Sequence, residues 1–179
     1  NSVAYTDSSD IGAFMREWLA LYESRSGERG IFNRQAAEKQ AAKNGRREDY
    51  KDFGTNPCSE IILRNKQFCN LTEVVVRPYD TMESLTKKVK DATILGTFQA
   101  TLTNFRYLTS KWKKNTEEES LLGVSLTGIM DNIDMINGKI DLEALKNEAI
   151  SINKVWAKKL GISQSAAITC VKPSGTVSQ

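Results

Sequence analysis

The strongest constraint on the fold of this chain is the order of its apolar segments. A long amphipathic stretch, Leu142–Leu160, is preceded by Asp141, a good helix N-cap, and followed by Gly161, a good helix stop. It lies between two short apolar runs, Leu121–Leu126 and Ala166–Val171, which are typical of buried strands. Strands that alternate with helices predict the α/β class, although a barrel, an open sheet and a part of either fit equally well.

Amphipathic spacing predicts three more helices. The first two cover Ser9–Ser24 and Arg34–Asn44. The third begins at a D-x-x-E capping box formed by Asp80 and Glu83, and it extends to Thr101 or beyond.

Two short strands are predicted in the middle of the chain, at Glu60–Leu63 and Asn70–Val76. Turn residues near Asn65 and Lys66 allow these strands to pair as a hairpin. The segment Lys111–Glu119 is highly charged, and we expect it to be solvated.

The composition excludes several classes of function. The 179 residues carry a net charge of +3 without a concentrated basic stripe, which argues against a nucleic-acid partner. No apolar run reaches the length of a membrane span and no signal peptide opens the chain, so we expect a cytoplasmic protein without a membrane partner. There is no histidine, and three cysteines do not make a disulfide framework. We predict no metal site, and acid–base chemistry must use other side chains.

The segment Asn56–Ile61 (NPCSEI) carries the most chemical information. In an extended chain Asn56, Cys58 and Glu60 project to one side, and Pro57 stiffens that presentation. A neighbouring carboxylate disfavours the thiolate form, so Cys58 suits hydrogen-atom transfer better than nucleophilic attack. From the residues alone, a plain loop with a buried cysteine and a solvated glutamate is the simpler interpretation.

Two other segments offer reactive or binding groups. Cys69 follows the predicted hairpin turn, which could bring it into one pocket with Cys58, but a small core residue is the alternative. The segment Pro173–Ser178 offers hydroxyls and backbone N–H groups of the kind that bind phosphate, but it lacks the Walker lysine. An ordinary turn is the alternative there, and Cys170 before it is interpreted as a core residue of the last strand.

Taken together, these segments resemble the catalytic chain of ribonucleotide reductases, in the same order. The closest resemblance is to the adenosylcobalamin-dependent ribonucleoside-triphosphate reductases, and it covers nearly the whole chain. The matching blocks are SGERGIFN at 26–33, NPCSEI at 56–61, FCNLTE at 68–73, GVSLTGI at 123–129 and VKPSGTVS at 171–178.

The resemblance implies a ten-stranded α/β barrel with a central finger loop that carries a radical cysteine. Residues 1–179 would then be a single partial domain, the middle of that barrel, because both ends of the chain look like the interior of a domain. The implied activity is reduction of ribonucleoside di- or triphosphates to supply DNA precursors. The implied cofactor is adenosylcobalamin, with most of its binding surface outside this chain, and the implied reductant is a thioredoxin-like dithiol. We do not expect the fragment to turn over alone.

The resemblance also implies residue roles. Cys58 becomes the thiyl radical, Glu60 is the general base, Asn56 orients the ribose and Cys69 belongs to the reducing dithiol. Ser59 stands where glycine is usual, which we expect to be tolerated in an extended loop. The residues implied in binding the substrate phosphates are Ser174, Gly175, Thr176 and Ser178.

Two rival interpretations remain open at this stage. The large subunit of an aerobic ribonucleoside-diphosphate reductase shares the N-P-C-x-E motif but takes its radical from a second subunit. A non-catalytic nucleotide-binding module would keep the phosphate segment and use Cys58 only structurally.

Overall fold

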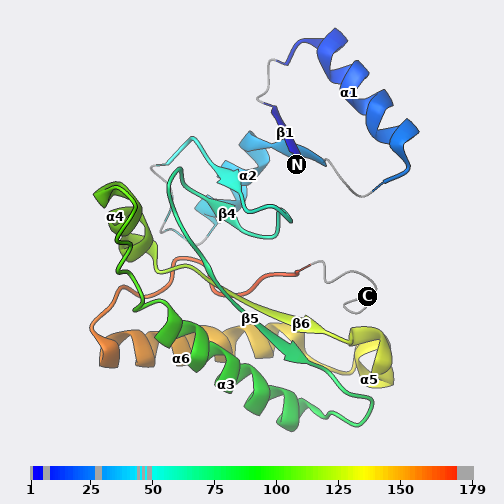
Figure 1. The fold of residues 1–179 in the computed structure, drawn as a ribbon. Coiled ribbons are helices and arrows are strands. Elements are labelled where there is room, and N and C mark those ends of the chain that lie inside the picture. Colours follow the sequence, from blue (N-terminus) through cyan, green and yellow to red (C-terminus); the bar gives the residue numbers. More distant parts are fainter. Residues whose placement is uncertain are drawn as a thin grey trace. The chain divides into compact units, whose positions relative to one another are not determined.

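The computed structural model describes residues 2–5, 9–26, 30–43, 45, 47 and 50–172. The chain forms two compact units, residues 1–65 and residues 66–179, which are described separately (Figure 1). Three two-stranded sheets are present among the described residues, two in the first unit and one in the second. The described residues are therefore mixed α/β, as predicted, but they show no closed barrel.

The first unit begins with a parallel strand pair joined by a helix. Strand β1 (Ser2–Tyr5) pairs with β2 (Gly30–Asn33), and α1 (Ile11–Ser24) connects them. Asp10 caps α1 by accepting a hydrogen bond from the Ala13 amide, so the predicted helix is confirmed. No residue of α1 is buried, however, and five of its large apolar side chains are exposed, namely Ile11, Met15, Trp18, Leu19 and Tyr22.

The rest of the first unit is a helix and a small hairpin around one aromatic side chain. Helix α2 (Arg34–Ala42) is capped by Asn33, close to its predicted bounds. Strands β3 (Gly54–Thr55) and β4 (Ile62–Leu63) pair antiparallel. Phe53, fully buried, packs with the buried alanines of α2 and with partly buried Ile62.

The second unit is built on a parallel strand pair. Strand β5 (Asn70–Val75) pairs with β6 (Leu122–Thr127) in a register that runs from Asn70 opposite Leu122 to Val75 opposite Thr127. Parallel strands need a long crossover, and here it contains two helices. The helical elements of this unit are α3 (Met82–Gln99), α4 (Ser110–Glu119), a 3₁₀ turn (Ile129–Asp131), α5 (Ile133–Ile136) and α6 (Leu142–Leu160).

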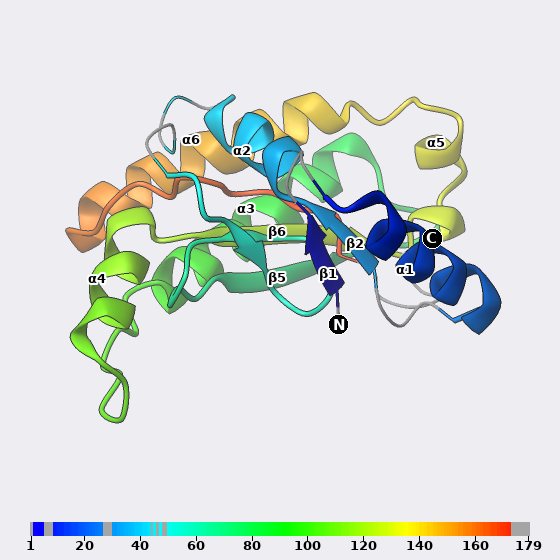
Figure 2. The ribbon, with the colours of Figure 1, turned by 90° about the horizontal axis from the view of Figure 1, so that it is seen from above.

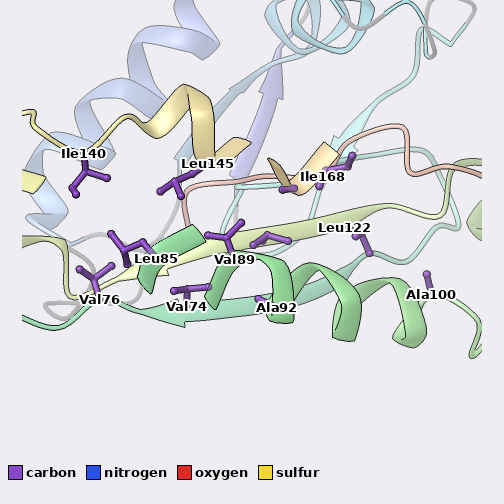
Figure 3. Packing of buried hydrophobic residues seen from close by; sticks show 12 residues of the cluster. Val74, Val76, Leu85, Val89, Ala92, Ala100, Leu122, Ile140, Leu145 and Ile168 are labelled. Atoms are coloured by element: carbon purple, nitrogen blue, oxygen red, sulfur yellow. The ribbon is translucent and has the colours of Figure 1, made fainter. Parts of the chain in front are cut away.

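The hydrophobic core of the second unit lies on one face of this sheet. Helices α3 and α6 pack together beneath β5 and β6 (Figures 1 and 2). Side chains from both helices and both strands fill the space between them (Figure 3). Leu85, Val89 and Ala92 of α3 are buried there, whereas Phe98 of the same helix is exposed.

The predicted last strand, Ala166–Val171, is only partly right. This segment runs beside β6, where the amides of Leu122 and Val124 donate to the carbonyls of Ala167 and Ile168. It forms a single parallel bridge between Thr169 and Val124 rather than a regular strand.

The predicted hairpin between Glu60–Leu63 and Asn70–Val76 is wrong. The first segment pairs with Gly54–Thr55, and the second pairs with the distant strand β6. Sequence patterns identified both segments as extended, but they do not specify which strand is the partner.

The capping residues predicted for α6 are confirmed, whereas those predicted for α3 are wrong. Helix α6 covers Leu142–Leu160 as predicted, because Asp141 caps its first turn and Gly161 adopts the left-handed conformation after it. The capping box of α3 consists of Thr81 and Ser84, not of Asp80 and Glu83.

Asp80 instead ties the end of β5 to α3. Its buried carboxylate accepts hydrogen bonds from Lys88, Ser84 and the Arg77 amide. Burial alone would raise the pKa of Asp80, but these hydrogen bonds, led by that from Lys88, hold it below its ordinary value of 3.8. Asn132, also buried, donates to the carbonyls of Arg77 and Asp80.

No helix within the described part of the chain is long and apolar enough to cross a membrane.

Because the pKa of Asp80 is lower in the folded chain, its ionised form stabilises the fold above about pH 4. That contribution is lost as the pH falls from the unfolded value through the lowered folded value. We predict that Asp80→Asn lowers the free energy of unfolding by about 1 to 3 kcal/mol at pH 7. In urea unfolding between pH 7 and pH 2, the difference from the wild type should shrink below pH 4. A constant difference across this range would contradict the role of the carboxylate charge.

Candidate functional site

The segment NPCSEI forms the closed end of the β3–β4 hairpin. The Asn56 amide donates to the Ile61 carbonyl at 3.3 Å, and the Ile61 amide donates to Asn56 Oδ1 at 3.1 Å. Within this frame the Ser59 amide donates to the Asn56 carbonyl at 3.0 Å, which makes Asn56–Ser59 a tight turn. Cys58 lies in that turn, exposed to solvent.

The turn corrects the expectation that Asn56, Cys58 and Glu60 project to one side of an extended chain. Asn56 Oδ1 accepts the hydrogen bond from the Ile61 amide that closes the hairpin. Nδ2 is therefore the part of the side-chain amide that is left to donate to a ligand. Cys58 is exposed, whereas both carboxylate oxygens of Glu60 are shielded from solvent. The simpler alternative, a buried cysteine beside a solvated glutamate, is reversed in the structure.

Ser59 shows why glycine suits this position. Its φ is +64°, in the left-handed region that L-residues with a side chain adopt at a cost. The expectation that Ser59 is tolerated because the loop is extended is therefore wrong. The serine hydroxyl lies 3.4 Å from that of Thr55, an exposed contact that offsets little of the cost.

The base of the hairpin is fixed by buried and cationic side chains of the same unit. Arg47, buried against the Phe53 ring, donates to the Ile62 carbonyl at 2.9 Å. Arg34 donates to the Phe53 carbonyl at 3.0 Å. These contacts anchor both strands of the hairpin, so the position of Cys58 within the unit is set by the packing around Phe53.

Cys69 belongs to the second unit and lies immediately before β5, half-buried. Its two neighbours are held by hydrogen bonds to the segment that leads into β6. The Phe68 amide donates to Thr116 Oγ1 at 3.2 Å, and Asn70 Nδ2 donates to the Leu121 carbonyl at 3.1 Å. The predicted hairpin that would join the two thiols is absent, so no local turn accounts for a shared pocket.

The predicted phosphate residues Ser174, Gly175, Thr176 and Ser178 lie outside the described residues. Just before them, the Lys172 amide donates to Ser125 Oγ at 3.1 Å. Cys170 precedes Lys172, is partly buried, and lines an apolar cavity of about 300 Å³ together with Val89 and Leu145.

Several residues of this region were missed by the sequence interpretation. Lys111–Glu119 is helix α4, largely solvated as expected, but Thr116 and Glu119 are buried. Gln67 Nε2 donates to Glu119 Oε2 at 2.7 Å, two residues before Cys69. The helical spacing of Trp112, Thr116 and Glu119 was a signal that one face of this charged segment is covered.

The curated relatives of this chain share one name. This chain is 32% identical over 155 residues to the adenosylcobalamin-dependent ribonucleoside-triphosphate reductase of Lactobacillus acidophilus, and the match covers 70% of this chain and 20% of that protein. Identity to the enzyme of the same name from Lacticaseibacillus paracasei is 27% over 192 residues, covering 90% of this chain and 25% of the relative. A third, from Euglena gracilis, is 29% identical over 140 residues, covering 73% of this chain and 18% of the relative.

This chain therefore spans a fifth to a quarter of the length of the first two of these relatives. No family model matches the chain, and no solved structure matches it. The comparisons confirm the resemblance seen in the sequence motifs, and they leave the roles of individual residues to be tested.

The strain at Ser59 generates a first prediction for the site. Ser59→Gly should stabilise the chain by about 0.5 to 1 kcal/mol, because glycine adopts the left-handed conformation without a steric cost. Ser59→Ala is the matched control, since it removes the hydroxyl and keeps the strain, and it should not stabilise. The measurement is urea unfolding of the three chains, and equal stability of the glycine and alanine variants would show that the left-handed conformation is not strained.

The closing pair generates a second prediction. Asn56→Ala should destabilise the chain by about 1 kcal/mol, because the Ile61 amide loses its side-chain acceptor. Asn56→Asp keeps an acceptor oxygen and loses the donor, so it should retain most of the stability. Thermal unfolding measures both variants, and an equal loss of stability would mean that Oδ1 does not close the hairpin.

Proposed function

We propose that this chain, which is related to the adenosylcobalamin-dependent ribonucleoside-triphosphate reductases, is the central part of the catalytic barrel of a ribonucleotide reductase. Residues 1–179 would form one portion of a ten-stranded barrel whose other strands lie elsewhere in the full protein. The protein would convert ribonucleotides into deoxyribonucleotides and so supply precursors for DNA. The parallel β5–β6 pair with helices on one face supports this placement, because α/β barrels are built from such units.

The observation that carries the proposal is the exposed thiol of Cys58 in a closed hairpin turn. A cysteine that passes a hydrogen atom between two other molecules needs a rigid support and an accessible sulfur. The closing pair of Asn56 and Ile61 and the anchored base of the hairpin supply the support. The turn conformation supplies the accessibility.

In the proposed reaction, the Cys58 thiyl radical abstracts the hydrogen atom from C3′ of the ribose, which forms an S–H bond and breaks a C–H bond. Glu60 accepts the proton of the 3′-hydroxyl and returns it after the reduction. The 2′-hydroxyl takes up a proton from the reducing thiols and leaves as water, and C2′ receives its new hydrogen from the same thiols. Asn56 orients the sugar through Nδ2, because its Oδ1 is engaged with Ile61. The hydrogen atom returns from Cys58 to C3′ at the end, so the thiyl radical is regenerated.

The two electrons for this reduction come from a pair of thiols that become a disulfide. Cys69 is proposed as one of them, and the other is a cysteine outside this chain. Each turnover forms one disulfide, one water and one deoxyribonucleotide, and a dithiol protein of the thioredoxin kind restores the thiols. The hydrogen bonds on both sides of Cys69 support this role, since they fix its backbone.

The proposed cofactor is adenosylcobalamin, which, when bound, supplies the radical that takes the hydrogen atom from the Cys58 thiol. The chain has no histidine and so offers cobalt no imidazole ligand. What it offers is the exposed sulfur of Cys58, which a cofactor held by another part of the protein could approach. The described residues therefore fit delivery of a radical to this chain better than anchorage of the cofactor by it.

The substrate proposed is a ribonucleoside phosphate, with Ser174, Gly175, Thr176 and Ser178 at its phosphates. Support comes from the Lys172 amide, which Ser125 holds immediately before this segment.

The test uses the full-length parent enzyme with a dithiol reductant, with and without adenosylcobalamin. Cys58→Ser should lower the rate of ribonucleotide reduction by at least about four orders of magnitude, because a serine hydroxyl cannot exchange a hydrogen atom with the ribose as a thiol does. Cys170→Ser is the matched control and should retain activity. Deoxyribonucleotide formation by the Cys58→Ser enzyme would refute the radical role, and activity that needs a second protein subunit instead of the cofactor would place the radical source elsewhere.

A further inference from the structure

One face of helix α4 contacts the chain that leads into Cys69. Four residues of this helix lie at the spacing of a single helix face, and we call them the inner face of α4. Its members are Trp112, Asn115, Thr116 and Glu119. All four contact Gln67 or Phe68, the two residues that precede Cys69. Although α4 is rich in charge, Thr116 and Glu119 on this face are only 3% and 2% exposed.

Gln67 makes the most buried of these contacts. Its side chain is 4% exposed, and its Nε2 donates to the Asn115 carbonyl at 3.0 Å and to Glu119 Oε2 at 2.7 Å. A side-chain amide has two N–H donors on its nitrogen, and these two acceptors use both of them. The side chain of Gln67 is therefore fixed in its orientation as well as in its position.

Phe68, the residue between Gln67 and Cys69, is held by aromatic packing and by its backbone. Its ring packs against Phe105 and Trp112, with ring centroids 5.0 and 4.8 Å apart. Its amide donates to an inner-face hydroxyl at 3.2 Å. The chain before the cysteine is thus fixed at two successive residues.

Asn70 fixes the chain on the other side of Cys69. Its backbone amide and its Nδ2 both donate to the Leu121 carbonyl, at 2.9 and 3.1 Å. Because the backbone is held on both sides, the sulfur of Cys69 can occupy only the three staggered positions about χ1. The contacts with α4 and Leu121 therefore determine where this thiol can lie.

Glu119 is an unfavourable residue at its position for two physical reasons. A buried carboxylate loses its hydration, which hydrogen bonds replace only in part. Glu119 is also the last residue of α4, where the helix dipole disfavours a negative charge. Apolar side chains of similar length at positions 67 and 119 would avoid both effects. What Gln67 and Glu119 provide instead is a directed hydrogen bond, which holds the chain before Cys69 in one arrangement.

We propose that Gln67 and Glu119 are positioning residues for Cys69, which hold its sulfur where it can form a disulfide with the second reducing cysteine. This inference rests on the proposed function, because it takes Cys69 as one of the two reducing thiols. As the ribonucleotide is reduced, two S–H bonds break and one S–S bond forms. A disulfide requires Cα atoms about 4.4 to 6.8 Å apart and a defined torsion about the S–S bond. The position of Cys69 should therefore affect the rate of this step and not the affinity for the nucleotide.

The first measurement is ribonucleotide reduction by the full-length parent enzyme with a dithiol reductant. The double variant Gln67→Met/Glu119→Met replaces the pair by apolar side chains of similar length, so it should fold without the directed hydrogen bond. We expect kcat to fall at least about tenfold, since a small displacement of a reacting group slows its reaction, while KM for the ribonucleotide stays within about twofold.

Two further variants separate positioning from general effects on α4. The single variant Glu119→Gln keeps an acceptor oxygen for Gln67, so it should recover most of the rate lost in the double variant. Glu117→Gln is the matched control, because Glu117 is exposed on the same helix and accepts a hydrogen bond from Thr103 instead. This control should leave kcat and KM unchanged. Thermal unfolding of all variants shows whether each of them is folded.

The second measurement follows the disulfide itself and needs neither nucleotide nor cofactor. Diamide oxidises two neighbouring thiols to a disulfide and is itself reduced to a hydrazine. Mass spectrometry of the digested enzyme then reports how fast the peptide with Cys69 becomes disulfide-bonded. The double variant should form this disulfide at least about tenfold more slowly than the wild type, because its thiols meet less often in the required geometry. Glu119→Gln and Glu117→Gln should form it at the rate of the wild type.

Equal rates of disulfide formation in the wild type and the folded double variant would overturn the positioning role and leave the proposed function standing. A fall in kcat that Glu117→Gln shares would overturn it as well. A wild-type enzyme that reduces ribonucleotides without a disulfide at Cys69 would refute both the reducing role of Cys69 and this inference. Slower oxidation of the double variant, in an enzyme that does not reduce ribonucleotides, would support the positioning role and contradict the proposed function.

Discussion

The parallel pairing of β5 with β6 is the constraint on which the second unit depends. Parallel strands cannot be joined by a tight turn, so the chain between them must cross over, and here the crossover contains α3. Helix α6 follows β6 and packs on α3, so both helices cover the same face of the sheet. This one pairing thus determines which face of the sheet the helices cover.

The first unit solves a different physical problem, which is to present a thiol without burying it. A short hairpin has few contacts of its own, and its stability must come from the closure of its loop and from the packing at its base. Asn56 and Ile61 close the loop, while Phe53, Arg47 and Arg34 fix the base. Ser59 adopts its left-handed conformation against the preference of its side chain. The hairpin therefore accepts local strain at the turn that exposes Cys58.

Sequence reasoning succeeded where local chemistry decides the structure. Helix α6 has the predicted bounds because its ends are specified by Asp141 and Gly161, residues with strong local preferences. Sequence reasoning failed where the partner of a strand is distant in the sequence. Asn70–Val76 was identified as a strand, but no local pattern indicates that it pairs with β6. The candidate site shows the same division. The motif NPCSEI predicts Cys58 as the reactive residue, and that role stays a prediction. The turn that exposes Cys58 depends on hydrogen bonds that an alternation pattern cannot represent.

The central claim is that the sulfur of Cys58 carries the unpaired electron during turnover. Electron paramagnetic resonance of the rapidly frozen parent enzyme, mixed with adenosylcobalamin and a ribonucleotide, tests it most directly. The claim predicts a signal that forms at a rate competent for turnover, changes when cysteine is deuterated at Cβ, and is absent in Cys58→Ser but present in Cys170→Ser. A signal that persists unchanged in Cys58→Ser, or that is insensitive to deuteration of cysteine, would contradict the claim.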